Sequence, residues 1–80
     1  MRVRMQVFIH GIRILTLVDP LEQNGTLVAE YEVAHANRFA QKLGYLRSGR
    51  TVEVLAGGRK GFIESAPNSQ RITIRLAENR

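Results

Sequence analysis

The sequence predicts an α+β domain, a small and mostly antiparallel curved sheet or partly open barrel in the order βββ-α-βββ, with one helix near 33–44. Two patterns carry this prediction. Apolar and polar residues alternate in segments on both sides of the middle of the chain, as they do in strands. Between 33 and 44 the apolar residues instead recur every three or four positions, as in a helix. Because 80 residues without a linker or repeat form one core, we expect a single domain, 1–80.

The first two predicted strands, 2–9 and 12–18, form a hairpin around His10-Gly11. Gly11 suits the positive φ angle that a two-residue turn requires, although His10 is a less usual choice than Asn or Asp. Such a turn sets four pairs on one face of the hairpin. The pairs are Ile9 with Ile12, Val7 with Ile14, Met5 with Thr16, and Val3 with Val18.

The opposite face of this hairpin then carries Phe8, Leu15 and Leu17. A sheet surface that faces water would not usually hold three large apolar side chains together. We therefore expect the helix, another sheet or a second subunit to cover them.

The middle of the chain predicts a third strand and the helix. Asp19-Pro20 is expected to break the second strand, and Asn24-Gly25 marks a turn. The segment 26–32 alternates like a strand; a helix that starts at Thr26 is the alternative, but it would place Glu32 on the apolar face. The helix should end at Gly44, read as the glycine just past its last turn. Its apolar stripe comprises Val33, Ala36, Phe39, Ala40 and Leu43.

The remaining segments complete the sheet. A turn at 47–50 precedes a strand at 51–56, and a glycine-rich loop at 57–61 precedes a strand at 62–66. After a turn at 67–69, a last strand at 70–76 turns Ile72, Ile74 and Leu76 inward.

Composition argues against enzyme chemistry. The chain has no Cys, so disulfides and thiolate sites are excluded, and its two His belong to no recognisable catalytic or metal-binding motif. Its carboxylates are scattered, which gives no paired acid and base. We predict no enzyme, no cofactor, no metal site and no small-molecule substrate. Without an apolar run of about 20 residues or a signal-peptide pattern, we expect no membrane segment and a cytoplasmic location.

Charge is the main functional clue. Twelve Lys and Arg oppose seven Asp and Glu, for a net charge of +5, and most of the basic residues are Arg, whose planar fork suits phosphate. A small basic domain favours nucleic acid as its partner, although net charge also simply keeps a protein soluble. We predict that the phosphate backbone of RNA or DNA contacts a basic strand face with one aromatic ring. Its residues are Arg47, Arg50, Arg59, Lys60, Phe62, Arg71 and Arg75.

Glycines flank two of these cations, in Gly57-Gly58-Arg59-Lys60-Gly61. Such a loop exposes backbone amides that can grip a phosphate together with Arg59 and Lys60. The alternative is a flexible hairpin loop with two solvated charges. The segment is not a P-loop, because the glycine-lysine-serine/threonine element and the following helix are missing.

Gly49-Arg50-Thr51-Val52-Glu53-Val54, followed by Gly57 and by Lys60-Gly61-Phe62-Ile63, keeps the spacing of a known motif. In these residues the chain partly resembles the KOW element of small SH3-like barrels found in transcription and ribosomal proteins. It departs from that element where Phe62-Ile63-Glu64 stands in place of a later glycine. The resemblance implies contact with RNA or with a polymerase, and no residue's role is carried over from it.

The first hairpin suggests a partner of another class. Arg13 lies on the same predicted face as Phe8, Leu15 and Leu17, and an apolar centre with arginine at its edge is common in protein interfaces. The alternative function is therefore protein interaction, as a homodimer, an adaptor or an inhibitor.

Overall fold

A computed structural model describes residues 2–63 and 71–77. Six antiparallel strands close into a barrel in the order β1-β2-β3-β6-β5-β4. The elements are β1 (Arg4–Ile9), β2 (Ile12–Gln23), β3 (Thr26–Val33), α1 (Ala36–Arg47), β4 (Val52–Ala56), β5 (Arg59–Ile63) and β6 (Arg71–Leu76). The predicted order βββ-α-βββ is confirmed, and 26–32 is a strand. The fold is mostly sheet, and the barrel is closed rather than partly open.

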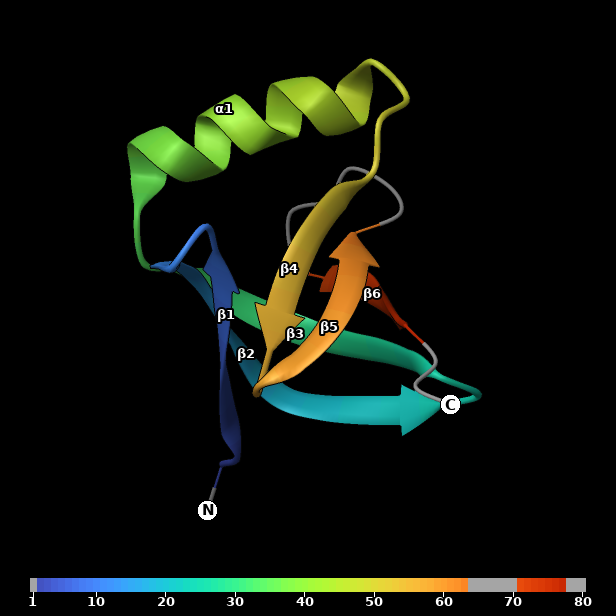
Figure 1. Cartoon of the computed structure of the whole chain (residues 1–80). Helices are drawn as coiled ribbons and strands as arrows, with labels where there is room; N and C mark the ends of the chain where they lie inside the picture. Colours follow the sequence, from blue (N-terminus) through green and yellow to red (C-terminus); the bar gives the residue numbers. More distant parts are fainter. Residues whose placement is uncertain (1, 64–70, 78–80) are drawn as a thin grey trace.

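The helix covers one end of this barrel. Figure 1 shows α1 lying across the end where the β1–β2 turn and the start of β4 are found, while the N-terminus lies at the other end. The alternation of the last three strands turns every second residue into the interior, as predicted for β6. These inward residues are Val52, Val54, Ala56, Gly61, Ile63, Ile72, Ile74 and Leu76, and all are buried.

The register of the first hairpin differs from the prediction. Ile9 lies opposite Ile12 as expected, but a β-bulge then shifts the pairing, so that Val7 lies opposite Leu15. Ile14 is the extra residue of the bulge, and both Ile14 and Leu15 point into the core. Beyond the bulge the pairs are Met5 with Leu17 and Arg4 with Val18, not Met5 with Thr16 and Val3 with Val18.

The second strand also continues through Asp19-Pro20, where the sequence predicts a break. Here a second bulge sets these two residues opposite one residue of β3, because Val18 pairs with Glu30 and Leu21 with Val28. Asp19 adopts a φ of 49° and ties the bulge to the N-terminal segment. Its N–H donates to the Val3 carbonyl at 2.7 Å, and the Val3 N–H donates to its Oδ1 at 2.8 Å. Pro20 fits because a bulge needs no ladder donor at that position.

The helix starts and ends later than predicted. Val33 belongs to β3, and Gly44 lies inside α1, which extends to Arg47. The face that meets the barrel is Phe39, Leu43 and Leu46, at spacings of four and three residues, with Leu46 buried. Ala36 and Ala40, expected on the apolar stripe, are exposed. The Phe39 ring packs on Tyr31 of β3 at 5.7 Å between centroids, which joins the helix to the sheet.

The predicted glycine-rich loop is shorter than expected. Only Gly57 and Gly58 form the turn, and Arg59, Lys60 and Gly61 belong to β5. Gly61 is required by close packing, since a Cβ there would lie 2.9 Å from Ile74 Cγ2 and 3.0 Å from the Arg75 carbonyl oxygen. The strand predicted at 62–66 begins earlier, as β5, and it is described only to Ile63. Its last part and the predicted turn at 67–69 lie outside the described residues.

Candidate nucleic-acid interface

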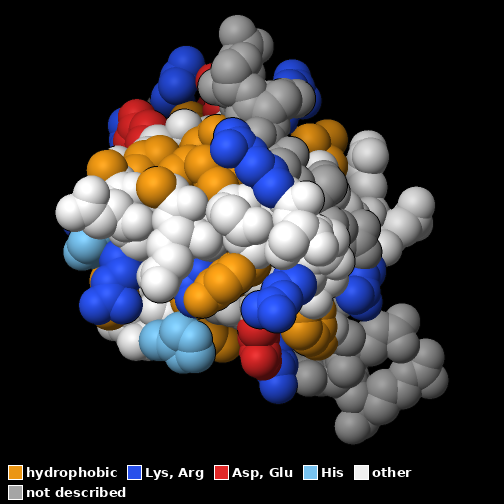
Figure 2. All heavy atoms as spheres, turned by 90° about the horizontal axis from the view of Figure 1, so that it is seen from above, with side chains coloured by type: hydrophobic (Ala, Val, Ile, Leu, Met, Phe, Trp, Pro, Cys, Tyr) orange, Lys and Arg blue, Asp and Glu red, His pale blue; other side chains and the backbone are white. Residues whose placement is uncertain are grey.

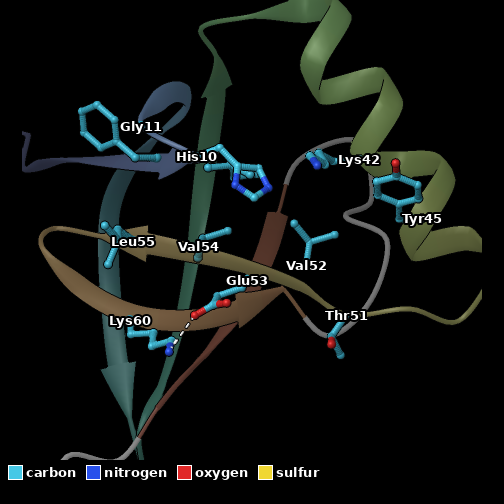
Figure 3. Close-up of a pocket in the computed structure, with 12 residues that line it drawn as sticks. His10, Gly11, Lys42, Tyr45, Thr51, Val52, Glu53, Val54, Leu55 and Lys60 are labelled. Carbon is cyan, nitrogen blue, oxygen red and sulfur yellow. Dashed lines mark ion pairs between the residues drawn. The ribbon is translucent and has the colours of Figure 1, made fainter.

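A groove opens where the barrel closes on itself. The strands β1 and β4 pair only through Val7 with Ala56 and Phe8 with Leu55, and beyond these pairs they diverge. The opening, here called the seam groove, has a volume of about 560 Å³. It is lined by residues 8–11 of the first hairpin, residues 51–55 at β4, Lys42 and Tyr45 of α1, and Lys60 of β5 (Figure 3).

Two cations surround the aromatic ring on the helix side of the seam groove. Lys42 and Tyr45 are three residues apart on α1, and the Lys42 ammonium lies 4.9 Å from the ring centroid. Gly49, with a φ of 87°, turns the chain back after the helix, and the Arg50 N–H donates to the Tyr45 carbonyl at 3.1 Å. This return places the Arg50 guanidinium 5.6 Å from the same ring. Tyr45 is 37% exposed, so the cluster faces solvent.

His10 reaches the seam groove from the opposite side. His10 and Gly11 have φ angles of 52° and 76°, which is the geometry of a type I′ turn. The turn directs the imidazole toward the space in front of Lys42 and Tyr45 (Figure 3). The sequence predicts only a turn residue here, because nothing in the local pattern indicates that a helix lies across the hairpin tip.

An ion pair crosses the mouth of the seam groove. Lys60 Nζ lies 2.8 Å from Glu53 Oε2, on the strand next to it, and this hydrogen bond raises the pKa of Lys60. Both side chains are more than half exposed. Lys60 therefore neutralises Glu53, the one carboxylate that lines the groove.

The residues of the predicted nucleic-acid surface do not form one continuous patch. Lys60 lines the seam groove and Arg50 lies beside its Tyr45 ring. Phe62 and Arg75 lie opposite each other on β5 and β6, with the guanidinium 5.3 Å from the ring centroid. Arg71 is further along β6, opposite Glu30 of β3.

The other two predicted cations lie apart from both groups. Arg47 is exposed in the last turn of α1. Arg59 binds Glu22 of β2 through two hydrogen bonds of 2.7 and 3.3 Å, which raise the pKa of Arg59 and lower that of Glu22. The predicted set missed Lys42 and Tyr45, although their helical spacing is visible in the sequence.

The predicted protein interface is corrected by the bulge in β2. Leu15 and Leu17 are both 0% exposed and lie inside the barrel, so neither belongs to an outer face. Phe8 remains half-buried on the outside and lines the seam groove. Arg13 is exposed and lies opposite Phe8.

Most of the described acidic residues are concentrated on two strands of the barrel. Asp19, Glu22, Glu30 and Glu32 lie on β2 and β3, and Glu53 is the one acidic residue that the structure describes on α1, β4, β5 and β6. Those four elements and the loop before β4, here called the basic side, carry Arg38, Lys42, Arg47, Arg50, Arg59, Lys60, Arg71 and Arg75. Figure 2, which looks onto the helix end, shows Lys and Arg spread among hydrophobic side chains, with acidic side chains in few places.

Among residues 2–63 and 71–77, no three His, Asp or Glu side chains gather closely enough to hold a metal ion. Within the same part of the chain, α1 is too short and too polar to cross a membrane. Comparison with protein-family models, with curated proteins and with solved structures finds no match to this chain.

Proposed function

We propose that this protein is a non-enzymatic binding module that contacts the phosphate backbone of RNA or DNA through its basic side. The observation that carries the proposal is the uneven distribution of charge. Four of the described acidic residues lie on β2 and β3 and only Glu53 is described on the basic side, so a polyanion that approaches α1, β4, β5 and β6 meets mostly cations, although Arg59 and Lys60 are ion-paired. A net charge spread evenly for solubility would not require this arrangement.

The aromatic rings of the basic side support the same function. Tyr45 has two cations over its ring, and Phe62 has one. Rings bordered by Lys and Arg suit nucleic acid, because the ring stacks on a base while the cations neutralise phosphates. The alternative, protein interaction through the first hairpin, loses its main support because Leu15 and Leu17 are buried in the protein's own core.

Fluorescence anisotropy with labelled RNA and DNA oligonucleotides tests the proposal. The logarithm of the binding constant should fall linearly with the logarithm of salt concentration, with a slope of about −0.7 for each phosphate contacted on a single strand. Lys42→Ala and Arg50→Ala should each weaken binding to every sequence and make the slope for a single strand shallower by about 0.7.

The control removes the same charge elsewhere. Arg2→Ala changes the net charge equally, but Arg2 is exposed at the end of the barrel far from α1 (Figure 1). It should leave the affinity within about twofold, because charges beyond a Debye length of roughly 8 Å are screened. Absence of binding at low salt refutes the proposal, and so does an equal loss in Arg2→Ala and Arg50→Ala.

A further inference from the structure

The seam groove contains an open backbone edge, and the strand ladders identify which residue presents it. Residues of an antiparallel strand direct their N–H and C=O groups alternately to its two neighbours. Around the two-residue turn, Ala56 pairs with Arg59 and Val54 with Gly61, so their backbone groups face β5. The Gly57 N–H donates in the other direction, to the Gln6 carbonyl of β1 at 3.0 Å. The backbone N–H and C=O groups of Leu55 and Glu53 must therefore also face β1.

Only one of these two residues meets a partner strand there. Leu55 lies opposite Phe8, but the pairing of β1 with β4 stops at this position. The next residue that faces β1, Glu53, lines the seam groove instead. Its side chain is held by Lys60 at the mouth of the groove, so its carboxylate charge is matched. The seam groove thus offers one hydrogen-bond donor and one acceptor side by side on a fixed strand.

Two rings stand on either side of this edge. Figure 3 shows His10 on the hairpin side of the groove and Lys42 and Tyr45 on the helix side, with the β4 residues below them. The groove volume of about 560 Å³ falls in the range of roughly 300–1,000 Å³ that is typical of small-molecule sites. A flat ring with polar atoms on one edge fits this combination of aromatic walls and an open strand.

The conformation of His10 is less usual for its position in the turn. A residue with a side chain pays about 1–2 kcal/mol for the left-handed conformation, and Asn or Gly suits the first position of a type I′ turn better. His10 adopts this conformation with a φ of 52°. Histidine is among the residues enriched in this conformation, so the strain is modest, and the turn holds its imidazole at the hairpin side of the seam groove.

We infer that the seam groove takes one unstacked base of a single-stranded RNA or DNA, an inference that rests on the proposed function. The base lies between Tyr45 and His10, and its hydrogen-bonding edge meets the backbone N–H and C=O of Glu53. Lys42, which lies over the Tyr45 ring in the free protein, swings on its flexible stem to a flanking phosphate, as a lysine side chain readily does. A base within a duplex is stacked on both faces and cannot enter without being flipped out.

The test compares three oligonucleotides that carry the same number of phosphates along one labelled strand. They are an intact single strand, the same strand with abasic sites, and the strand in a duplex. The intact single strand should bind about five- to hundredfold more tightly than the other two, the range expected when one base stacks on an aromatic ring. The salt slope for the abasic strand should equal that for the intact strand, because the phosphate contacts are shared.

Substitutions test whether the seam groove causes the preference for the intact single strand. Tyr45→Ala should remove the preference for the intact strand over the abasic strand, and Tyr45→Phe should keep it, because the phenyl ring still stacks. His10→Gly should weaken the preference while raising the thermal midpoint, which separates loss of binding from loss of folding. Arg2→Ala should retain the full preference.

Different results refute base binding in the seam groove and phosphate binding by the basic side. Equal affinity for intact and abasic strands, with the expected salt slope, overturns the inference and leaves the proposed function standing. A Tyr45→Ala protein that still prefers the intact strand also overturns it. If none of the oligonucleotides binds at low salt, both fall.

Discussion

The same substitution, glycine to alanine, should have opposite effects at two positions of this fold. At Gly61 a methyl group would point into the barrel against β6. It would lie 2.9 Å from Ile74 Cγ2 and 3.0 Å from the Arg75 carbonyl oxygen. Carbon atoms rest at about 3.5–4.0 Å from one another, so the first contact is short by roughly 0.6–1 Å. The carbonyl belongs to the strand backbone and cannot rotate away.

At Gly44 the added methyl group meets nothing within 4 Å, and the glycine does not have a left-handed φ. Gly44 is an interior residue of α1, where alanine is favoured over glycine by about 1 kcal/mol. Gly44 and Gly61 are therefore a matched pair of positions, because an added methyl group has room at Gly44 and none at Gly61.

Gly61→Ala should lower the free energy of unfolding by about 1–2.5 kcal/mol, because overpacking against a backbone carbonyl costs about 2–3 kcal/mol, the upper part of the usual range, and loss of the glycine's backbone freedom returns about 0.5–1 kcal/mol. Gly44→Ala should raise it by about 1 kcal/mol. In a domain of this size, each kcal/mol moves the Tm by roughly 4–8 °C. Urea denaturation followed by circular dichroism measures both changes, and an unchanged m-value shows that the comparison is valid.

The two results test different parts of the structure. A destabilised Gly44→Ala protein would mean that the helix ends at Gly44 in a left-handed conformation, as its sequence first indicates, and would refute the helix end at Arg47. A neutral Gly61→Ala protein would refute the close approach of β5 and β6.

Two further predictions concern the helix face and pH. Leu46→Ala should cost about 2–5 kcal/mol of unfolding free energy because it empties a buried position. Ala40→Gln, on the exposed side of the helix, should change the unfolding free energy by no more than about 0.5 kcal/mol. Equal losses in urea denaturation would contradict the assigned helix face. The hydrogen bond from Arg59 lowers the pKa of Glu22 in the folded protein, so its contribution to stability is present above the unfolded carboxyl value of 4.5 and is lost as pH falls through the folded pKa. Glu22→Gln should therefore flatten the fall of the urea midpoint below about pH 4.5, and an unchanged acid limb would show that the pair contributes nothing in solution.

Periodicity predicted most strands and their inward faces, because alternation depends only on which residues are apolar. It failed at Ile14, where a bulge adds one residue to β2 and moves Leu15 and Leu17 from the outside to the core. No residue type marks that bulge in the sequence. The strand break predicted at Pro20 was wrong for a related reason, since a second bulge removes the need for the N–H that proline lacks.

The prediction of the helix end was wrong because two glycines, Gly44 and Gly49, could each end the helix. Gly44 has the expected position after Leu43, but Gly49 has the positive φ that turns the chain. Continuing to Arg47 allows Leu46 to be buried against the barrel, and tertiary packing of that side chain outweighs the cost of an internal glycine.

The candidate site was predictable in composition but not in place. The sequence identified cations and Phe62 on the last strands. The seam groove, in contrast, depends on where β1 and β4 stop pairing and on α1 crossing the barrel end, which are tertiary features. Lys42, Tyr45 and Arg50 are close in sequence, and their spacing was the available signal.

The short pairing of β1 with β4 also has a consequence for the order of folding. Three hairpins are closed by two-residue turns with positive φ at both positions, His10-Gly11, Asn24-Gly25 and Gly57-Gly58. Such local hairpins form in roughly 1–10 μs. The pairing of β1 with β4 and of β3 with β6 joins segments far apart in the chain, and non-local pairing is slow. Until it forms, the edges of β1 and β4 are open to other chains, so the refolding yield should decline as protein concentration rises.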